Sequence, residues 1–290
     1  MTERDPFPAA ALAGRPVETE TIIDVHGHCA GLDEPAGPAP RAWPLSARTL
    51  LDAMRKVGAA HLVFSHFAAL RATTSGDLEA AHRDTENIVR HAAGRLSAHL
   101  VLHPCFSTEV RAQLDRMPPH VDYVGAKLHG ELHDVRANSA QVAPLLARCE
   151  ELGLTVLLHV HPADTLADIG GLAGRFPRLN FILAHLWPRL DGAAALFRAH
   201  PNLFTDTSLS FGLPGAVERM IDAVGGARVV YGSDSSYLSM GGQFAKVACS
   251  ALPLAVKRQV FSANARTVLP LLARKLPAPI PPAPTPTQSP

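Results

Sequence analysis

Thr21-Ile-Ile-Asp-Val-His-Gly-His28 is an apolar stretch that ends in two histidines separated by one glycine. Its apolar residues are typical of a strand buried on both faces. Because side chains two apart in a strand point the same way, His26 and His28 can reach one point at the strand's end. Gly27 lets the backbone bend close to that point, and two neutral imidazoles suit a first-row metal such as zinc. The same pattern also occurs on strands that bind nothing, so its meaning depends on the rest of the chain.

The composition is that of a globular protein with a substantial core. The chain has 290 residues, of which 47% are hydrophobic and 18% charged, with a net charge of +1. No basic stripe indicates nucleic acid or an anionic membrane surface. No apolar run is long enough to span a bilayer, and the first residues lack the features of a signal peptide. We therefore expect a cytoplasmic protein whose four scattered cysteines are reduced.

Strand and helix patterns alternate along the chain. Apolar runs that predict strands occupy residues 22–25, 61–65, 96–102, 121–128, 154–158, 179–184, 203–205 and 228–231. Helical patterns separate them, and eight such units at this length favour a single α/β domain, a (β/α)8 TIM barrel over residues 19–274. A doubly wound open sheet is the alternative, but the glycine-rich turn and phosphate loop of nucleotide-binding sheets are absent. We expect residues 1–18 to form a flexible arm and the proline-rich residues 275–290 a disordered tail.

Polar residues that can bind metal or move protons follow most of the predicted strands. They are His26 and His28, Lys127 and His129, His159 and His161, His185, and Asp234. Catalytic groups of a barrel lie at the carboxyl ends of its strands, because those ends surround one mouth. We therefore expect these side chains to share a small volume, although about two hundred positions separate the first from the last.

Several of these residues allow more than one interpretation. His159 is favoured as a metal ligand over His161, which would then bond a loop. Lys127 is either a catalytic group or a buried partner for Asp234. His129 is expected near the site but not on the metal. The segment 206–208 could orient a ligand or form a turn or helix cap.

The ordered motifs at residues 24–28, 125–129, 158–159, 183–185 and 232–234 resemble those of the amidohydrolase superfamily. More narrowly, residues 20–272 are similar to the branch that contains aminocarboxymuconate-semialdehyde decarboxylase and "amidohydrolase 2" proteins. The resemblance implies a metal-dependent barrel in which one Zn2+ is held by His26, His28, His159 and Asp234, while His185 is a catalytic acid or base. The sequence departs from that branch at residues 185–188, where His-Leu-Trp-Pro replaces the usual His-x-Gly-Gly, and at His161, where a small residue is more usual.

Three imidazoles and one carboxylate leave an open position on a metal, as a catalytic site requires. A water bound there ionises near neutral pH, and Asp234 can accept its proton. We therefore expect a hydrolase that cleaves a C–N or C–O bond of a small amide or lactone, with Asp234, His185 and Lys127 as catalytic residues. A carboxylated Lys127 would bridge two metals and make His185 a ligand.

Two other functions remain open. The same site could remove carbon dioxide from a small aromatic or dienoic acid without oxidation, a reaction that requires an arginine to bind carboxylate. Arg41 and Arg189 are the candidates for that arginine. A metal-binding barrel without catalysis is the third interpretation. In each case the partner is a small molecule, contacted by His161, Trp187, His129, Arg41 and Tyr237, and the protein could be a homo-oligomer.

Overall fold

The computed structural model describes residues 3–33, 46–117, 123–186, 189–209 and 214–276. Eight parallel strands pair in chain order, as the sequence predicts. Their bounds are β1 (Ile22–Cys29), β2 (Ala59–His66), β3 (Leu96–Val101), β4 (Tyr123–His129), β5 (Val156–His159), β6 (Phe181–Ala184), β7 (Leu203–Asp206) and β8 (Val229–Val230). The segment after β8 returns to β1, where Val25 N donates to Tyr231 O at 3.0 Å and Asp234 N to His26 O at 2.7 Å. These bonds close the barrel.

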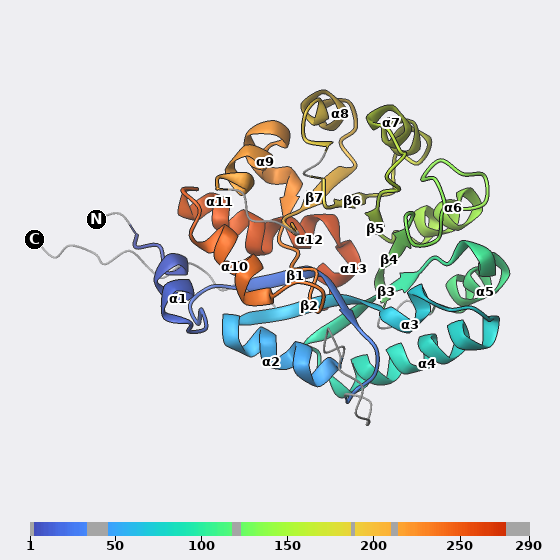
Figure 1. Cartoon of the computed structure of the whole chain (residues 1–290), viewed down its shortest axis with the longest axis horizontal. Helices are drawn as coiled ribbons and strands as arrows, with labels where there is room; N and C mark the ends of the chain where they lie inside the picture. Colours follow the sequence, from blue (N-terminus) through green and yellow to red (C-terminus); the bar gives the residue numbers. More distant parts are fainter. Residues whose placement is uncertain (1–2, 34–45, 118–122, 187–188, 210–213, 277–290) are drawn as a thin grey trace, which may run out of the picture.

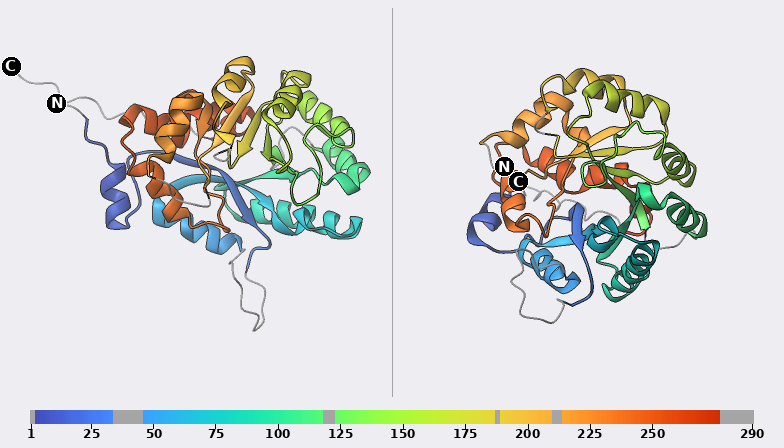
Figure 2. Two further views of the ribbon diagram at one scale, coloured as in Figure 1. Left: turned by 45° about the horizontal axis from the view of Figure 1, so that its top comes forward. Right: turned by 45° about the vertical axis from the view of Figure 1, so that its right-hand side comes forward.

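Helices surround the strands, as Figures 1 and 2 show. Their bounds are α1 (Phe7–Ala13), α2 (Ala47–Val57), α3 (Phe67–Leu70), α4 (Ser75–His91), α5 (Ser107–Arg116), α6 (Ala143–Leu152), α7 (Leu166–Arg175), α8 (Ala193–Ala199), α9 (Ala216–Val224), α10 (Met240–Ala248), α11 (Leu254–Arg258), α12 (Asn264–Val268) and α13 (Pro270–Ala273). Ser46 caps the start of α2, because its side chain accepts from Thr49 N. Gly58 and Gly153 end α2 and α6 in the left-handed conformation. None of the helices in the described residues is long and apolar enough to cross a membrane.

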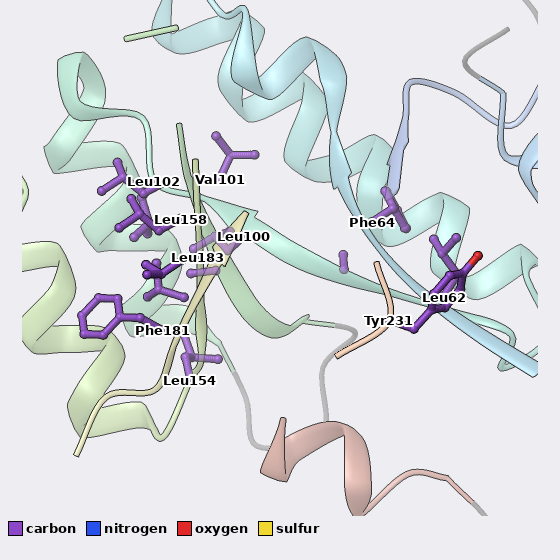
Figure 3. Close-up of a cluster of buried hydrophobic side chains, with 14 of the residues drawn as sticks. Leu62, Phe64, Leu100, Val101, Leu102, Leu154, Leu158, Phe181, Leu183 and Tyr231 are labelled. Atoms are coloured by element: carbon purple, nitrogen blue, oxygen red, sulfur yellow. The ribbon is translucent and has the colours of Figure 1, made fainter. Parts of the chain in front are cut away.

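The core has two parts, divided by the alternation of side chains along the strands. The outer part lies between the strands and the helices and includes Leu62, Leu158 and Leu183 (Figure 3). The inner part fills the barrel with the alternate residues Val63, Leu157 and Ile182. Helices α12 and α13 add Val268 and Leu272 to this inner part. Apolar side chains therefore close the end of the barrel opposite the carboxyl ends of the strands. The carboxyl ends of the strands are therefore left as the place for a site.

Strand β1 changes the face it presents to the barrel partway along its length. Ile23 and Val25 belong to the inner core, whereas His26 and His28, of the other parity, reach Asp234 at the mouth. The pairing of β1 with β2 shifts register between Asp24 and Gly27. Such irregularities turn side chains that a regular strand would point away, and this one turns the histidine pair towards the site.

The N-terminal segment differs from the flexible arm expected from sequence. Residues 7–13 form α1, and Phe7 is fully buried with its ring 4.7 Å from that of Phe261. Lys257 Nζ also lies 2.6 Å from Asp5 Oδ2. The alanine- and proline-rich sequence did not predict the packing of α1, because a single aromatic residue gives no periodic pattern. The tail from residue 277 onward lies outside the described residues.

Gly125 in β4 is a position where the fold has no room for a side chain. A Cβ there would lie 2.5 Å from His99 Nδ1 and 2.7 Å from Thr155 O. We expect Gly125→Ala to lower the free energy of unfolding by about 1–3 kcal/mol, the usual cost of overpacking, in a urea titration. Gly171→Ala in α7 is the matched control, since nothing lies within 4 Å of its Cβ. It should be neutral or stabilising by up to about 1 kcal/mol. Equal stability of both variants would contradict this account of β4.

Candidate active site

Three imidazoles from two strand ends meet around the Asp234 carboxylate. Its Oδ1 lies 3.3 Å from His26 Nε2 and 3.1 Å from His28 Nε2, while Oδ2 lies 3.6 Å from His185 Nε2. His185 directly follows β6, and Asp234 follows β8. One ligand atom each from His26, His185 and Asp234 lies within 4.8 Å of the others. The structure thus brings together four of the residues expected from sequence, in a group that could hold a metal ion.

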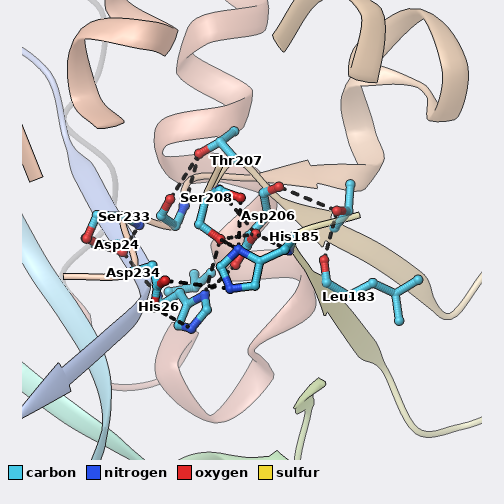
Figure 4. A network of polar contacts seen from close by, with 12 residues as sticks. Asp24, His26, Leu183, His185, Asp206, Thr207, Ser208, Ser233 and Asp234 are labelled. Carbon is cyan, nitrogen blue, oxygen red and sulfur yellow. Dashed lines mark hydrogen bonds and ion pairs between the residues drawn. The ribbon is translucent and has the colours of Figure 1, made fainter. Parts of the chain in front are cut away.

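The segment 206–208 at the end of β7 orients this group (Figure 4). Asp206 Oδ2 lies 2.6 Å from His26 Nδ1, and Asp206 Oδ1 accepts from Ser208 Oγ at 2.7 Å. His185 Nδ1 lies 3.2 Å from the Ser208 carbonyl oxygen. These partners leave Nε2 of both histidines facing Asp234. Of the two interpretations left open by the sequence, these bonds favour the orienting one for Asp206.

Burial and mutual charge set the protonation of the group. Burial raises the pKa of Asp234, but the nearby imidazoles of His26, His28 and His185 outweigh it and hold that pKa below its usual range. Burial lowers the pKa of His26 and His28. Asp234 is thus an anion beside the neutral imidazoles of His26 and His28, and a carboxylate with imidazoles is the donor set that binds zinc and similar cations. The residues present fit a divalent metal.

Two members of the group have a strained backbone. His185 and Asp234 have φ angles of 55° and 54°, in the left-handed region that non-glycine residues rarely adopt. Strain of this kind persists only where the surroundings enforce it, and it clusters at functional sites. Here the Asp234 N–H donates to His26 O at 2.7 Å, which holds the strained turn against β1.

Lys127 in β4 is fully buried beside the group, with Nζ 3.3 Å from His26 Nε2. Burial lowers the pKa of Lys127 to about 8, while Asp234 and Asp206 oppose this shift. Because Nδ1 of His26 donates its hydrogen bond to Asp206, Nε2 carries the lone pair, and this lone pair faces the Lys127 amine. A cation that binds His26 therefore competes with Lys127 for that lone pair.

His159 and His161 at the end of β5 have different environments. His159 Nε2 lies 2.9 Å from Glu131 Oε2, and its ring is 4.9 Å from that of His185 and stacked on His129 at 4.0 Å. Burial, reinforced by Lys127 and His185, lowers the pKa of His159 to about 3. His161 turns to Asp134, 3.2 Å away. The structure places His159, and not His161, beside the group.

A cavity of about 1090 Å³ opens onto the group. Its lining includes His28, His185 and Asp234 from the group, together with His129 and Tyr237, two of the residues expected to contact substrate. His161, also expected there, is not among the described residues that line the cavity. Arg41 and Trp187 lie outside the described residues.

The cavity wall also contains residues that the sequence did not single out. Arg71 follows α3 and lines the cavity, as does Glu131 after β4. Both lie in connections between strands and helices, where no periodic pattern or motif marks a functional side chain. The sequence contained no signal that could have placed them here.

Comparisons with known proteins agree with the barrel and its strand-end motifs. The model of the Amidohydrolase family Amidohydro_2 matches residues 23–271, so the chain belongs to this family. No curated protein matches the chain.

Solved structures with the same fold include several decarboxylases. The 5-carboxyvanillate decarboxylase LigW from Sphingomonas paucimobilis is 18% identical, with a TM-score of 0.68 over 86% of this chain and 99% of that one. The 2,6-dihydroxybenzoate decarboxylase from Rhizobium is 16% identical, with a TM-score of 0.65 over 88% and 99%. The 5-carboxyvanillate decarboxylase from Novosphingobium aromaticivorans, crystallised with manganese and a nitrobenzoic acid, is 11% identical, with a TM-score of 0.67 over 89% and 98%.

Metal content tests the role of Lys127. With a single ion and an unmodified lysine, wild-type protein should bind close to one ion per chain. Lys127→Met should bind the same number more tightly, because a competing ammonium is removed. The measurements are elemental analysis, chelator competition and intact mass. Two ions in the wild type, an added CO2 in its mass and loss of one ion in the variant would instead establish a carboxylated lysine.

Proposed function

We propose that this protein is a metal-dependent enzyme that removes carbon dioxide, without oxidation, from a small aromatic acid. The observation that carries the proposal is the Arg71 guanidinium, which lines the same cavity as His185 and Asp234. The decarboxylases that share this fold, one of them crystallised with manganese and a benzoic acid, support the same choice. This proposal reverses the order expected from sequence, in which hydrolysis came first.

Arg71 is suited to bind an aromatic acid. Its guanidinium carbon lies 5.0 Å from the centre of the Phe67 ring, and Tyr237 lines the cavity with its ring 5.6 Å from Phe67. A guanidinium offers two parallel N–H groups to a carboxylate, and the Tyr237 ring in the cavity wall offers an aromatic substrate an apolar face. Arg71 would hold the acid in one orientation.

Arg189, the weaker candidate from sequence, is already engaged. Its side chain donates to the carbonyl oxygens of His161 at 2.9 Å, Pro162 at 3.1 Å and Asp164 at 3.3 Å. These bonds tie the connection after β6 to the connection after β5. We therefore assign Arg189 a positioning role and Arg71 the anionic group of the substrate.

The metal would be held by His26, His28, His159 and Asp234, and it would supply positive charge that polarises an oxygen of the substrate. His185 is the member of the group suited to move a proton, because 21% of its side chain is exposed while the His26 side chain is fully buried. Its Nδ1 bonds the Ser208 carbonyl, so Nε2 is the atom that exchanges a proton. Asp234 Oδ2 lies 3.6 Å from that nitrogen.

The reaction needs one proton and no oxidant. Protonated His185 gives its Nε2 proton to the ring carbon that bears the carboxylate. The bond between that carbon and the carboxylate then breaks, its electron pair returns to the ring, and carbon dioxide leaves. His185 regains a proton from solvent through the open cavity. The buried apolar walls around Leu70 and Val160 would exclude water from the rest of the substrate.

Carbon dioxide release tests the proposal. Metal-loaded protein should convert hydroxybenzoic acids to the corresponding phenols with equimolar carbon dioxide, and chelation should abolish turnover. His185→Gln should lower kcat by about 10²–10⁴, the usual contribution of a general acid, while keeping its metal. Asp234→Asn should lose metal and activity together. Hydrolysis of lactones or amides with no carbon dioxide from any acid would overturn the proposal in favour of a hydrolase.

Substrate affinity tests Arg71 separately. A hydrogen bond between charged groups contributes about 1.5–3 kcal/mol, so Arg71→Met should raise KM for the acid by roughly ten- to a hundredfold without loss of metal. Arg175→Met is the matched control, because Arg175 also stacks on a phenylalanine, Phe176, but does not line this cavity. An unchanged KM in Arg71→Met would remove Arg71 from the binding site.

A further inference from the structure

Two of the three histidines around Asp234, His26 and His185, share a pattern in which one ring nitrogen is fixed by a second group. His26 uses Nδ1 for Asp206, and His185 uses Nδ1 for the Ser208 carbonyl oxygen. In each case Nε2 is left facing the carboxylate. Partners of this kind fix the tautomer and the orientation of metal-binding histidines.

His159 shows the same pattern with its two nitrogens exchanged. Its Nε2 lies 2.9 Å from Glu131 Oε2. An ionised carboxylate can only accept hydrogen bonds, so Nε2 carries the proton and Nδ1 keeps the lone pair. The ring plane is fixed further by His129, which stacks on it at 4.0 Å with an angle of 12°. Nδ1 is therefore the one nitrogen of His159 available to a metal.

The backbone also holds Glu131 in register with His159. Gly130 N donates to His159 O at 2.9 Å, and Val135 N donates to Gly130 O at 2.9 Å. Gly130 allows this close approach, because a Cβ there would lie 2.8 Å from Val135 O and 3.0 Å from His161 N. The connection after β4 is thus fastened to the end of β5 immediately beside Glu131.

We propose that Glu131 is a positioning residue for the metal ligand His159, fixing its tautomer and ring plane so that Nδ1 binds the ion. The inference rests on the metal centre of the proposed function and extends it to a residue of the cavity wall. Glu131 does for His159 what Asp206 does for His26, but from a surface connection, since 56% of its side chain is exposed.

A neighbouring pair provides the matched comparison. Asp134 Oδ1 lies 3.2 Å from His161 Nε2, so this pair is also a carboxylate on an imidazole Nε2, two residues after the end of β5. His161 Nδ1, however, accepts from Ala163 N at 3.1 Å. Both nitrogens of His161 are engaged, and it has none left for a metal. Removal of Asp134 should therefore leave the metal centre unchanged.

Metal affinity is the test, measured with Zn2+ by chelator competition and with Co2+ by its visible absorption spectrum. Glu131→Ala should weaken metal binding by about 10–100-fold, the range found for partners of metal-binding histidines, and should alter the cobalt spectrum. Glu131→Gln, whose amide oxygen can still accept from Nε2, should recover part of the affinity. Asp206→Asn should weaken binding as a positive control, and Asp134→Ala should match the wild type.

The outcomes separate this inference from the proposed function. A wild-type protein that binds neither Zn2+ nor Co2+ would overturn the proposed function. Wild-type binding with unchanged affinity and spectrum in Glu131→Ala would overturn only the role of Glu131, as would equal losses in Glu131→Ala and Asp134→Ala. If Glu131→Ala does not fold, Glu131→Leu decides, because leucine has no acceptor for Nε2, and wild-type metal affinity with a wild-type cobalt spectrum in that variant would overturn the role of Glu131.

Discussion

The Asp234 carboxylate is the charge around which the site is built. It is nearly buried, yet the imidazoles of His26, His28 and His185 keep its pKa low. An anion in such a place must be paired, since an isolated buried carboxylate would take up a proton instead. Neutral imidazoles stabilise it only partly, and the buried Lys127 amine faces His26, with Nζ 3.3 Å from Nε2. The arrangement therefore has room for one more positive charge, which a divalent cation would supply.

Different strands of the barrel contribute the side chains of this site. Strand β1 contributes two imidazoles, β7 contributes Asp206, and the turn after β8 contributes Asp234. Asp24 joins two of these parts, because its Oδ1 accepts from Ser233 N at 2.9 Å and from His26 N at 3.1 Å. Burial raises the pKa of Asp24 to about 7, so the ionised form of the carboxyl group that makes this link is destabilised by its surroundings. Such a group persists where the local geometry matters more than stability.

The barrel and most of the central group could be predicted from the sequence, because both depend on strands. Apolar runs mark the strands, and parallel strands in a barrel bring His26, His185 and Asp234 to one end. The connections could not be predicted in this way. Arg71 and Glu131 take their positions from α3 and from bonds such as Gly130 N to His159 O, which no local pattern reveals. The roles that we propose for Arg71 and Glu131 therefore could not be reached from the sequence.

The register shift in β1 lets one strand serve two independent requirements. The register of β1 shifts between Asp24 and Gly27. Ile23 and Val25 fill the inside of the barrel, whereas His26 and His28 contact Asp234 at the mouth. Mutations that repack the interior can therefore accumulate without redirecting the imidazoles. Conversely, a single-residue insertion between Val25 and His26 would leave Ile23 and Val25 in place while turning both imidazoles to the opposite face of the strand. This short segment therefore separates the positions that determine the packing of the barrel from the positions that determine the chemistry of the site.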